Sequence, residues 1–201
     1  MKPILSLSLL TLMFTGCSSA PTNKGTEVGL RLEDSAYEKL IQTHTQSDKA
    51  YNGLNNTFQI HATQVNSEVQ SALLQKYSDT LQWNTSTGLK EREKALQEMS
   101  SQSQFAVSFF TPTRRHNDLH KSISIWKLYL EHNGRRFEGT AQKKNLQIVQ
   151  LKKLYPYHNR WSTAYTVTFK VPMTVLERQN SKLILTSMLG QTELKYSALP
   201  Q

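Results

Sequence analysis

The chain has 201 residues, of which 37% are hydrophobic, and its mean hydropathy is −0.53. This length and composition suit one folded domain and exclude an intrinsically disordered protein. A single cysteine excludes a disulfide framework. Beyond the N-terminal segment, no apolar run approaches the about 20 residues that a membrane-spanning helix needs.

The N-terminus has the pattern of an export signal. Lys2 precedes an apolar stretch over residues 4–14, and two small residues separate this stretch from Cys17. A short charged region, a short apolar region and small residues are typical of a secretory signal. The apolar stretch is too short to span a membrane. We therefore expect residues 1–16 to be a signal peptide.

The sequence Phe14-Thr15-Gly16-Cys17 resembles the lipobox of bacterial lipoproteins, with Phe14 where leucine is usual. The resemblance implies that the signal is cut before Cys17 and that this cysteine is acylated, for example with palmitate. Two or three acyl chains, at about 0.8 kcal/mol per buried methylene, make a stable anchor. By the sorting pattern of such lipoproteins, Ser18 favours the outer membrane, facing the periplasm. An ordinary secretory signal with an incidental cysteine is the alternative.

After the cysteine, residues 17–32 are rich in Ser, Thr, Pro and Gly and are expected to be a tether. Residues 33–201 are expected to form a single α+β domain. Ser35 and Glu38 have the spacing of a capping box, which predicts the start of an N-terminal helix. Tyr37, Leu40, Ile41 and His44 follow at helical spacing.

A first strand and a helical pair are expected next. Residues 56–65 alternate between apolar and polar side chains, as a strand does. Asn66 can cap a helix in which Val69, Leu73, Tyr77 and Leu81 recur every four residues. A third helix is expected over residues 88–102, with few apolar residues and so on the surface.

From residue 105 onward the sequence favours strands. They are expected at residues 105–111, 122–132, 135–139, 146–151, 161–171, 182–189 and 192–196. The strand over 161–171 alternates cleanly, so six of its side chains are expected to face inward: Trp161, Thr163, Tyr165, Val167, Phe169 and Val171. Asn133-Gly134 is typical of a type I′ hairpin turn, because that turn needs positive φ at both positions. Regular short strands predict an antiparallel, immunoglobulin-like β-sandwich, with the helical pair inserted after the first strand.

The positive charge of the chain is concentrated in one stretch. Residues 111–160 contain eleven Lys and Arg against three Asp and Glu, whereas residues 17–110 contain eight against ten. In an exported protein, anionic lipids, lipid A or acidic polymers are more plausible partners than nucleic acid. A basic surface that only confers solubility is the alternative. The candidate anion-binding residues are Arg114, Arg115, Lys121, Arg135, Arg136, Lys143, Lys144, Lys152, Lys153 and Arg160.

The expected strand alternation places these cations at two ends of the sandwich. If consecutive strands run antiparallel, the loops over residues 112–121 and 140–145 share one end. The turn at 133–134 and the loop over 152–160 then share the other. His116 and His158 would not meet.

Two short motifs contain side chains that are able to form a site. His116 and His120 are four residues apart, a spacing that can bind a metal on a helix, but Arg114, Arg115 and Lys121 surround them with positive charge. We therefore expect no metal site and no cofactor. In the loop over residues 155–161, the side chains of Tyr157, His158, Arg160 and Trp161 could bind a sugar or a peptide. Burial of the aromatic residues for packing is the favoured interpretation.

Little in the sequence supports nucleophilic catalysis. It contains no Gly-x-Ser-x-Gly elbow and no phosphate-binding glycine loop, and its one cysteine is expected to carry the lipid. We therefore expect a lipid-anchored envelope protein that acts as a non-catalytic binding or structural module with a basic surface. Its partners would be anionic lipids, lipid A or envelope proteins. The alternative is an envelope hydrolase that acts on cell-wall glycan or lipid. Two carboxylates, or a histidine and a carboxylate, in one cleft would favour the enzyme.

Overall fold

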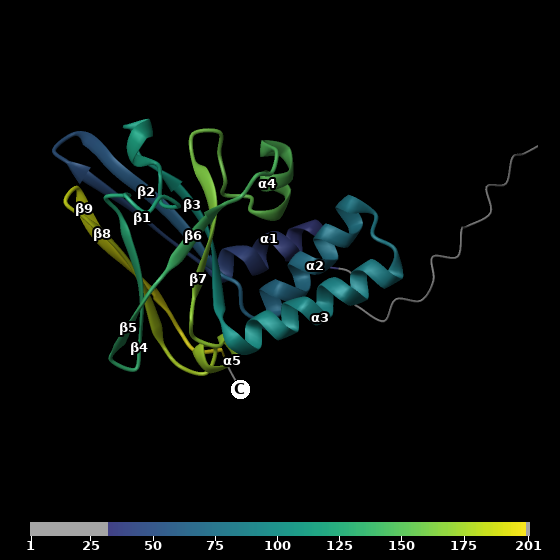
Figure 1. Ribbon diagram of the computed structural model, residues 1–201. Helices are drawn as coiled ribbons and strands as arrows, with labels where there is room; N and C mark the ends of the chain where they lie inside the picture. The colour runs from purple at the N-terminus through teal and green to yellow at the C-terminus, as the bar shows by residue number, and fades with distance from the viewer. Residues whose placement is uncertain (1–31, 200–201) are drawn as a thin grey trace, which may run out of the picture. The chain divides into compact units, whose positions relative to one another are not determined.

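Two antiparallel sheets form the framework of residues 32–199, the part of the chain that this computed structural model describes (Figure 1). The first sheet has the strand order β1-β2-β3-β7-β6 and the second has the order β5-β4-β8-β9. Five helices accompany them, so this part of the chain is α+β. The expected signal peptide, Cys17 and the tether up to residue 31 lie outside the described residues.

The strands of the first sheet are β1 (Thr45–Asn52), β2 (Asn55–Gln64), β3 (Ser103–Phe110), β6 (Thr140–Lys143) and β7 (Thr163–Phe169). Those of the second are β4 (Lys127–His132), β5 (Arg135–Glu138), β8 (Ser181–Ser187) and β9 (Gly190–Tyr196). Asn133 and Gly134 join β4 to β5 with φ values of 51° and 71°. The positive φ predicted for both turn residues is confirmed.

The main apolar core lies between the two sheets. Its largest buried side chains come from alternate positions of the strands: Phe58, Ile60, Phe105, Phe109, Tyr165, Phe169, Leu130, Leu183 and Leu185. Each such side chain contributes roughly 1.5–3 kcal/mol by leaving water. The inward alternation predicted for β7 is confirmed for Tyr165, Val167 and Phe169. It is wrong for Trp161, which is exposed because the strand begins only at Thr163.

Gly139 lets the chain pass from the second sheet to the first. It stands between the last residue of β5 and the first residue of β6. A Cβ atom at this position would lie 2.6 Å from Cε1 of Phe169 and 3.0 Å from Cγ1 of Val167. Only glycine allows the backbone to approach the core this closely.

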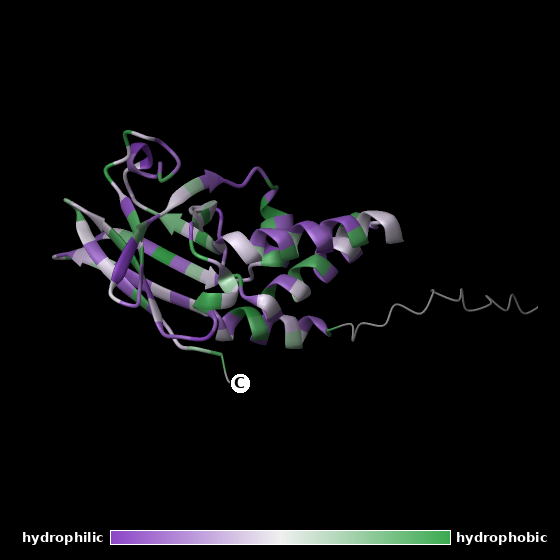
Figure 2. Ribbon diagram, turned by 60° about the horizontal axis from the view of Figure 1, so that its bottom comes forward, coloured by the Kyte–Doolittle hydropathy of each residue, from purple (hydrophilic) through white to green (hydrophobic). Residues whose placement is uncertain are grey.

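Helices cover the outer face of the first sheet (Figures 1 and 2). They are α1 (Asp34–Thr43), α2 (Ser67–Leu81), α3 (Thr85–Ser101) and α4 (Ile148–Leu154), while the short α5 (Met173–Leu176) follows β7. A second apolar core joins Tyr37, Val69, Leu73 and Leu154 to Ala106 of β3. All these strand pairings and both cores lie within residues 32–199, so a soluble form that begins at residue 18 keeps them.

The predicted helical pair is present as α2 and α3. Asn66 caps α2 as expected, since its Oδ1 accepts a hydrogen bond of 2.9 Å from the backbone nitrogen of Val69. In α3 only Ala95 is buried, which agrees with its predicted place on the surface. The prediction that Ser35 and Glu38 form a capping box at the start of α1 is wrong, because α1 already begins at Asp34.

Three expectations about the strands are corrected. Residues 146–151 do not form a strand, because most of this stretch belongs to helix α4. The strand predicted over 122–132 begins only at Lys127. Strand β1 was not predicted, because it is a mostly exposed edge strand without apolar alternation. The helical pair therefore follows the second strand, not the first.

Candidate functional site

Three loops leave the first sheet at the same end. Phe110 at the end of β3 pairs with Gln59 near the start of β2, and Phe109 pairs with Thr163 at the start of β7. Lys143 at the end of β6 pairs with Tyr165. The β1–β2 turn and the loops over 111–126 and 144–162 therefore share this end, which we call the loop end.

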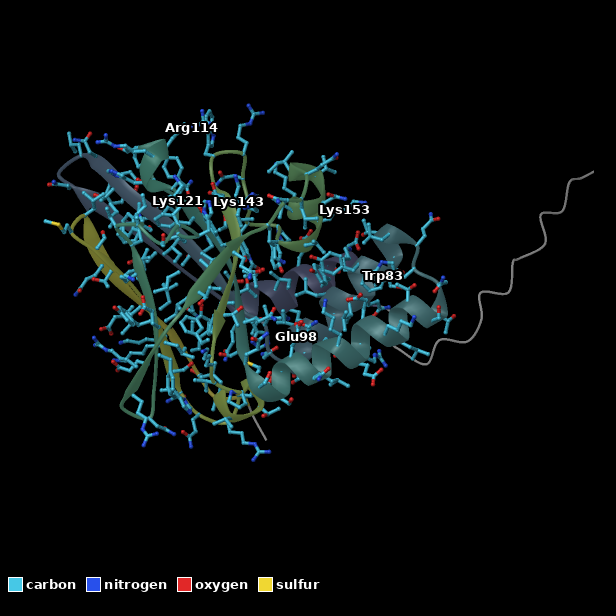
Figure 3. All side chains as sticks on the ribbon, in the orientation of Figure 1. Trp83, Glu98, Arg114, Lys121, Lys143 and Lys153 are labelled. Atoms are coloured by element: carbon cyan, nitrogen blue, oxygen red, sulfur yellow. The ribbon has the colours of Figure 1, made fainter. Side chains whose placement is uncertain are left out.

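The loop end gathers cations that we expected to be divided. Because residues 146–151 form a helix instead of a strand, β7 runs opposite to the direction that the alternation predicted. The loop over 152–160 therefore lies beside the loop over 112–121, and the expected separation of these two loops is wrong. Arg114, Arg115, Lys121, Lys143 and Arg160 are all exposed here; Figure 3 labels Arg114, Lys121 and Lys143.

The other candidate cations lie in three different places. Arg135 and Arg136 follow the β4–β5 turn at the opposite end, as expected, and Nε of Arg136 donates a 3.0 Å hydrogen bond to Glu131. That bond is the largest cause of the lowered pKa of Glu131. Lys152 and Lys153 are exposed on α4. Nζ of Lys144 donates a 3.2 Å hydrogen bond to the hydroxyl of Tyr155 and so points toward the helices.

The loop that carries Arg114 and Arg115 is fixed to the core. Asn117 donates to the carbonyl oxygen of Phe109 at 3.2 Å, and the hydroxyl of Tyr165 donates to the carbonyl oxygen of Asn117 at 2.8 Å. Nε1 of the buried Trp126 donates to the carbonyl oxygen of His116 at 2.8 Å. Burial, as the largest cause, raises the pKa of Tyr165 to about 12, so its hydroxyl stays a donor at neutral pH. The two arginines therefore stand on an ordered loop.

A polar cavity of about 280 Å³ lies beside this loop. Lys121, His120, Ser122 and Ser124 line one side, and residues from β4 to β6 line the other. On the β4–β6 side, Nζ of Lys127 donates to Glu138 at 2.7 Å, a bond that raises the pKa of Lys127. Ammonium, imidazole and hydroxyl groups are the donors that a phosphate or carboxylate accepts.

A second cavity, of about 290 Å³, lies between α2, α3 and the first sheet. The rings of Tyr77 and Trp83 stack at one side with centroids 6.1 Å apart. The same cavity is lined by the carboxylates of Glu91 and Glu98, both on α3 (Figure 3 labels Trp83 and Glu98). Seven helical residues separate their backbones by about 10.5 Å along the axis. In glycosidases the relevant distance is the one between the two carboxyl groups, about 5–9.5 Å, and two glutamate side chains can lean toward each other from backbones this far apart.

The loop over 155–161 does not bring its four candidate residues together. Tyr157 is mostly buried: its hydroxyl is 2.6 Å from Oγ1 of Thr63, and its ring stacks on His61 at 5.2 Å. His158 is also buried. Arg160 and Trp161 are exposed, with the guanidinium 6.0 Å from the centre of the indole ring. The first two pack on the sheet, and the last two belong to the loop end.

Ser108 and His158 form a hydrogen-bonded pair, with Oγ and Nδ1 2.8 Å apart. A serine and a histidine in contact can be a nucleophile and its base. Here both are buried, and the cavity beside them has a volume of about 10 Å³, room for no more than one water molecule. Burial lowers the pKa of His158, and Lys152 and His61 add to this effect. The pair is therefore a neutral packing contact that no substrate reaches.

The predicted absence of a metal at His116 and His120 stays a prediction. The ring of His120 lies 5.8 Å from that of Tyr165. Within residues 32–199, no group of three or more His, Cys, Asp or Glu side chains is arranged to hold a metal ion. Nor does any helix in this part of the chain combine the length and apolar character that crossing a membrane requires.

Four exposed apolar side chains stand at turns and loops, and we call them the apolar tips: Leu54, Ile123, Trp161 and Met188. Sequence reasoning singled out Trp161 as a candidate but missed the other three. Leu54 and Met188 are fully exposed, while Ile123 is 84% and Trp161 is 71% exposed. Each lies in a turn or loop. The signal was present at Leu54, which follows Gly53, and at Met188, which lies just before Gly190, because glycine marks turns.

The tip of the β8–β9 turn also lies toward the loop end. Strand β9 runs beside β1, where Oγ1 of Thr192 donates to Asp48 at 2.6 Å. Lys127, the first residue of β4 after the loop over 111–126, pairs with Thr186, two residues before Met188. The four apolar tips and the five exposed cations therefore belong to one end of the sandwich.

Comparison of the chain with protein-family models, with curated proteins and with solved structures finds no match.

Proposed function

We propose that this chain is a lipid-anchored protein of the bacterial cell envelope and that it acts as a non-catalytic binding module. The loop end binds anionic groups of the envelope, such as lipid phosphates, lipid A or acidic polymers. The anchor is Cys17, the location is the outer membrane facing the periplasm, and the domain follows the tether. The lipobox-like sequence supports the anchor and the location. The immunoglobulin-like form of the sandwich stays a prediction.

The observation that carries the proposal is the gathering of Arg114, Arg115, Lys121, Lys143 and Arg160 at one end. Charges of one sign on neighbouring loops reinforce one another and raise the local concentration of anions. The carboxylate of Asp118 in the same loop accepts a hydrogen bond from Ser124 and offsets only one of these charges. The polar cavity beside Lys121 supports the proposal, because it offers further donors to an anion.

Binding of lipid A and of a soluble polyphosphate to a form that begins at residue 18 tests this proposal. Affinity should fall steeply with added salt, because the Debye length shrinks from about 10 Å at 0.1 M to 3 Å at 1 M. The double variant Arg114→Gln/Arg115→Gln should bind roughly 25-fold more weakly, at about 1 kcal/mol per cation. The matched variant Arg135→Gln/Arg136→Gln removes the same charge at the opposite end and should bind like the unaltered protein. Equal losses in both variants would contradict the proposal.

The second candidate is an envelope hydrolase that acts on cell-wall glycan or lipid. Two carboxylates in one cavity, Glu91 and Glu98, favour it. The burial of the Ser108–His158 pair disfavours it, because no substrate reaches this serine and histidine. Hydrolysis of purified cell-wall glycan or lipid by the protein, lost in both Glu91→Gln and Glu98→Gln, would establish the enzyme and displace the binding module.

A further inference from the structure

The loop end presents apolar side chains and cations together. Leu54, Ile123, Trp161 and Met188 project from four separate loops, and Arg114, Arg115, Lys121 and Arg160 stand on two of the same loops. In Figure 2, hydrophobic segments appear on loops at the end of the sheets away from α2 and α3. Exposed apolar side chains that accompany Lys and Arg on one side of a protein are the combination found on surfaces that lie on an anionic membrane.

We propose that the loop end docks on an anionic lipid bilayer, with the apolar tips inserted at the headgroup boundary and the cations on the phosphates. This inference rests on the proposed function and names its ligand. It adds a second source of affinity, since the tips enter the apolar layer whereas the cations stay at its surface. Trp161, with Arg160 against its ring, has the amphipathic character of residues that lie at a membrane interface.

The arrangement of the tips favours a bilayer over a protein partner. The core of a protein interface is a contiguous apolar patch from which charged residues are depleted. Here each tip stands on its own turn, and two of the tips have cations in the same loop: Arg114, Arg115 and Lys121 with Ile123, and Arg160 with Trp161. A fluid bilayer accommodates separate insertion points, and anionic headgroups are complementary to the cations of the same loops.

Binding of the form that begins at residue 18 to lipid vesicles tests the inference. The vesicles are phosphatidylcholine alone or phosphatidylcholine with phosphatidylglycerol. The tip variant Leu54→Ser/Ile123→Ser/Met188→Ser should bind the anionic vesicles about 100-fold more weakly, at roughly fivefold per tip. It should bind soluble polyphosphate unchanged. The matched control Leu81→Ser/Leu89→Ser/Leu96→Ser alters exposed leucines of α2 and α3 and should bind both ligands like the unaltered protein.

The outcomes separate this inference from the proposed function. If the tip variant binds anionic vesicles as tightly as the control while both bind polyphosphate, insertion is refuted and the anion-binding module stands. If the unaltered protein binds neither polyphosphate nor vesicles, both proposals fail. A tip variant that changes only the oligomeric state assigns the tips to a protein interface and overturns the inference. Circular dichroism on each variant verifies that its fold is retained.

Discussion

The hydroxyl of Tyr165 donates a 2.8 Å hydrogen bond to the carbonyl oxygen of Asn117 and so ties strand β7 of the core to the loop that carries Arg114 and Arg115. The two residues are 48 positions apart in the chain. Through this bond, the packing of the sandwich determines where the cations of the loop end stand.

Tyr165→Phe should therefore affect both stability and binding. The substitution leaves the carbonyl oxygen of Asn117 without this partner, which costs about 1–2 kcal/mol in the free energy of unfolding. A looser loop should also weaken polyphosphate binding a few-fold. Chemical denaturation and a binding titration measure the two effects. Tyr51→Phe, at an exposed site, is the control and should change neither; a Tyr165→Phe protein as stable as this control would refute the role of the bond.

Gly139→Ala should destabilise the sandwich. The new methyl group would lie 2.6 Å from Cε1 of Phe169, so a core ring must move, at a cost of about 1–3 kcal/mol in the free energy of unfolding. Gly88→Ala in α3 is the matched control, because no atom lies within 4 Å of its added Cβ. In a helix that substitution should stabilise by up to about 1 kcal/mol. Thermal unfolding of both variants provides the comparison, and equal stabilities would contradict the close approach at Gly139.

Stability should fall as the pH decreases from about 7.5 to 5.5. Burial lowers the pKa values of His158 and His61 in the folded protein, and Lys152 and Lys49, respectively, add to this effect. The unfolded chain titrates near the ordinary value of about 6.5 and so binds more protons than the folded protein just below that pH. Protonation then favours the unfolded state. Denaturation at several pH values should show this slope, reduced in His61→Gln/His158→Gln; an unchanged slope would exclude these two imidazoles as its source.

Cys17→Ser should abolish membrane anchoring. Without the thiol there is no acceptor for the acyl chains, and the protein should accumulate uncleaved or in soluble form. Fractionation of cells that express each form detects the change, with Ser18→Ala as a neighbouring control that keeps the thiol. Mass spectrometry that finds an unmodified Cys17 in the mature protein would disprove the anchor.

Much of the fold follows from local patterns. Three local patterns predict features that the structure contains. Asn66, before apolar residues that recur every four positions, predicts the cap of α2. Asn133-Gly134 predicts the β4–β5 turn, and the alternation of Tyr165, Val167 and Phe169 predicts their inward orientation. In each case the local preference of the chain agrees with its tertiary packing, which is the condition for such predictions to succeed.

The errors have equally local causes. Residues 146–151 are a short apolar run, whose periodicity alone cannot separate a strand from a helix. In α4, Leu151 and Leu154 face the core while Val149 is exposed, which is the three-residue spacing of a helix. This one misassignment reversed the expected direction of β7 and hid the gathering of cations. Three of the four apolar tips escaped prediction because exposure is decided by the tertiary fold.

The most direct test of the loop end as an anion-binding surface is a nuclear magnetic resonance titration of the form that begins at residue 18. Polyphosphate is added to isotopically labelled protein, and the backbone amide shifts are mapped onto the structure. The largest shifts should fall in residues 111–126 and 143–162 and should decrease with added salt. Shifts concentrated at the β4–β5 turn around Arg135 and Arg136, or spread evenly over the surface, would contradict it.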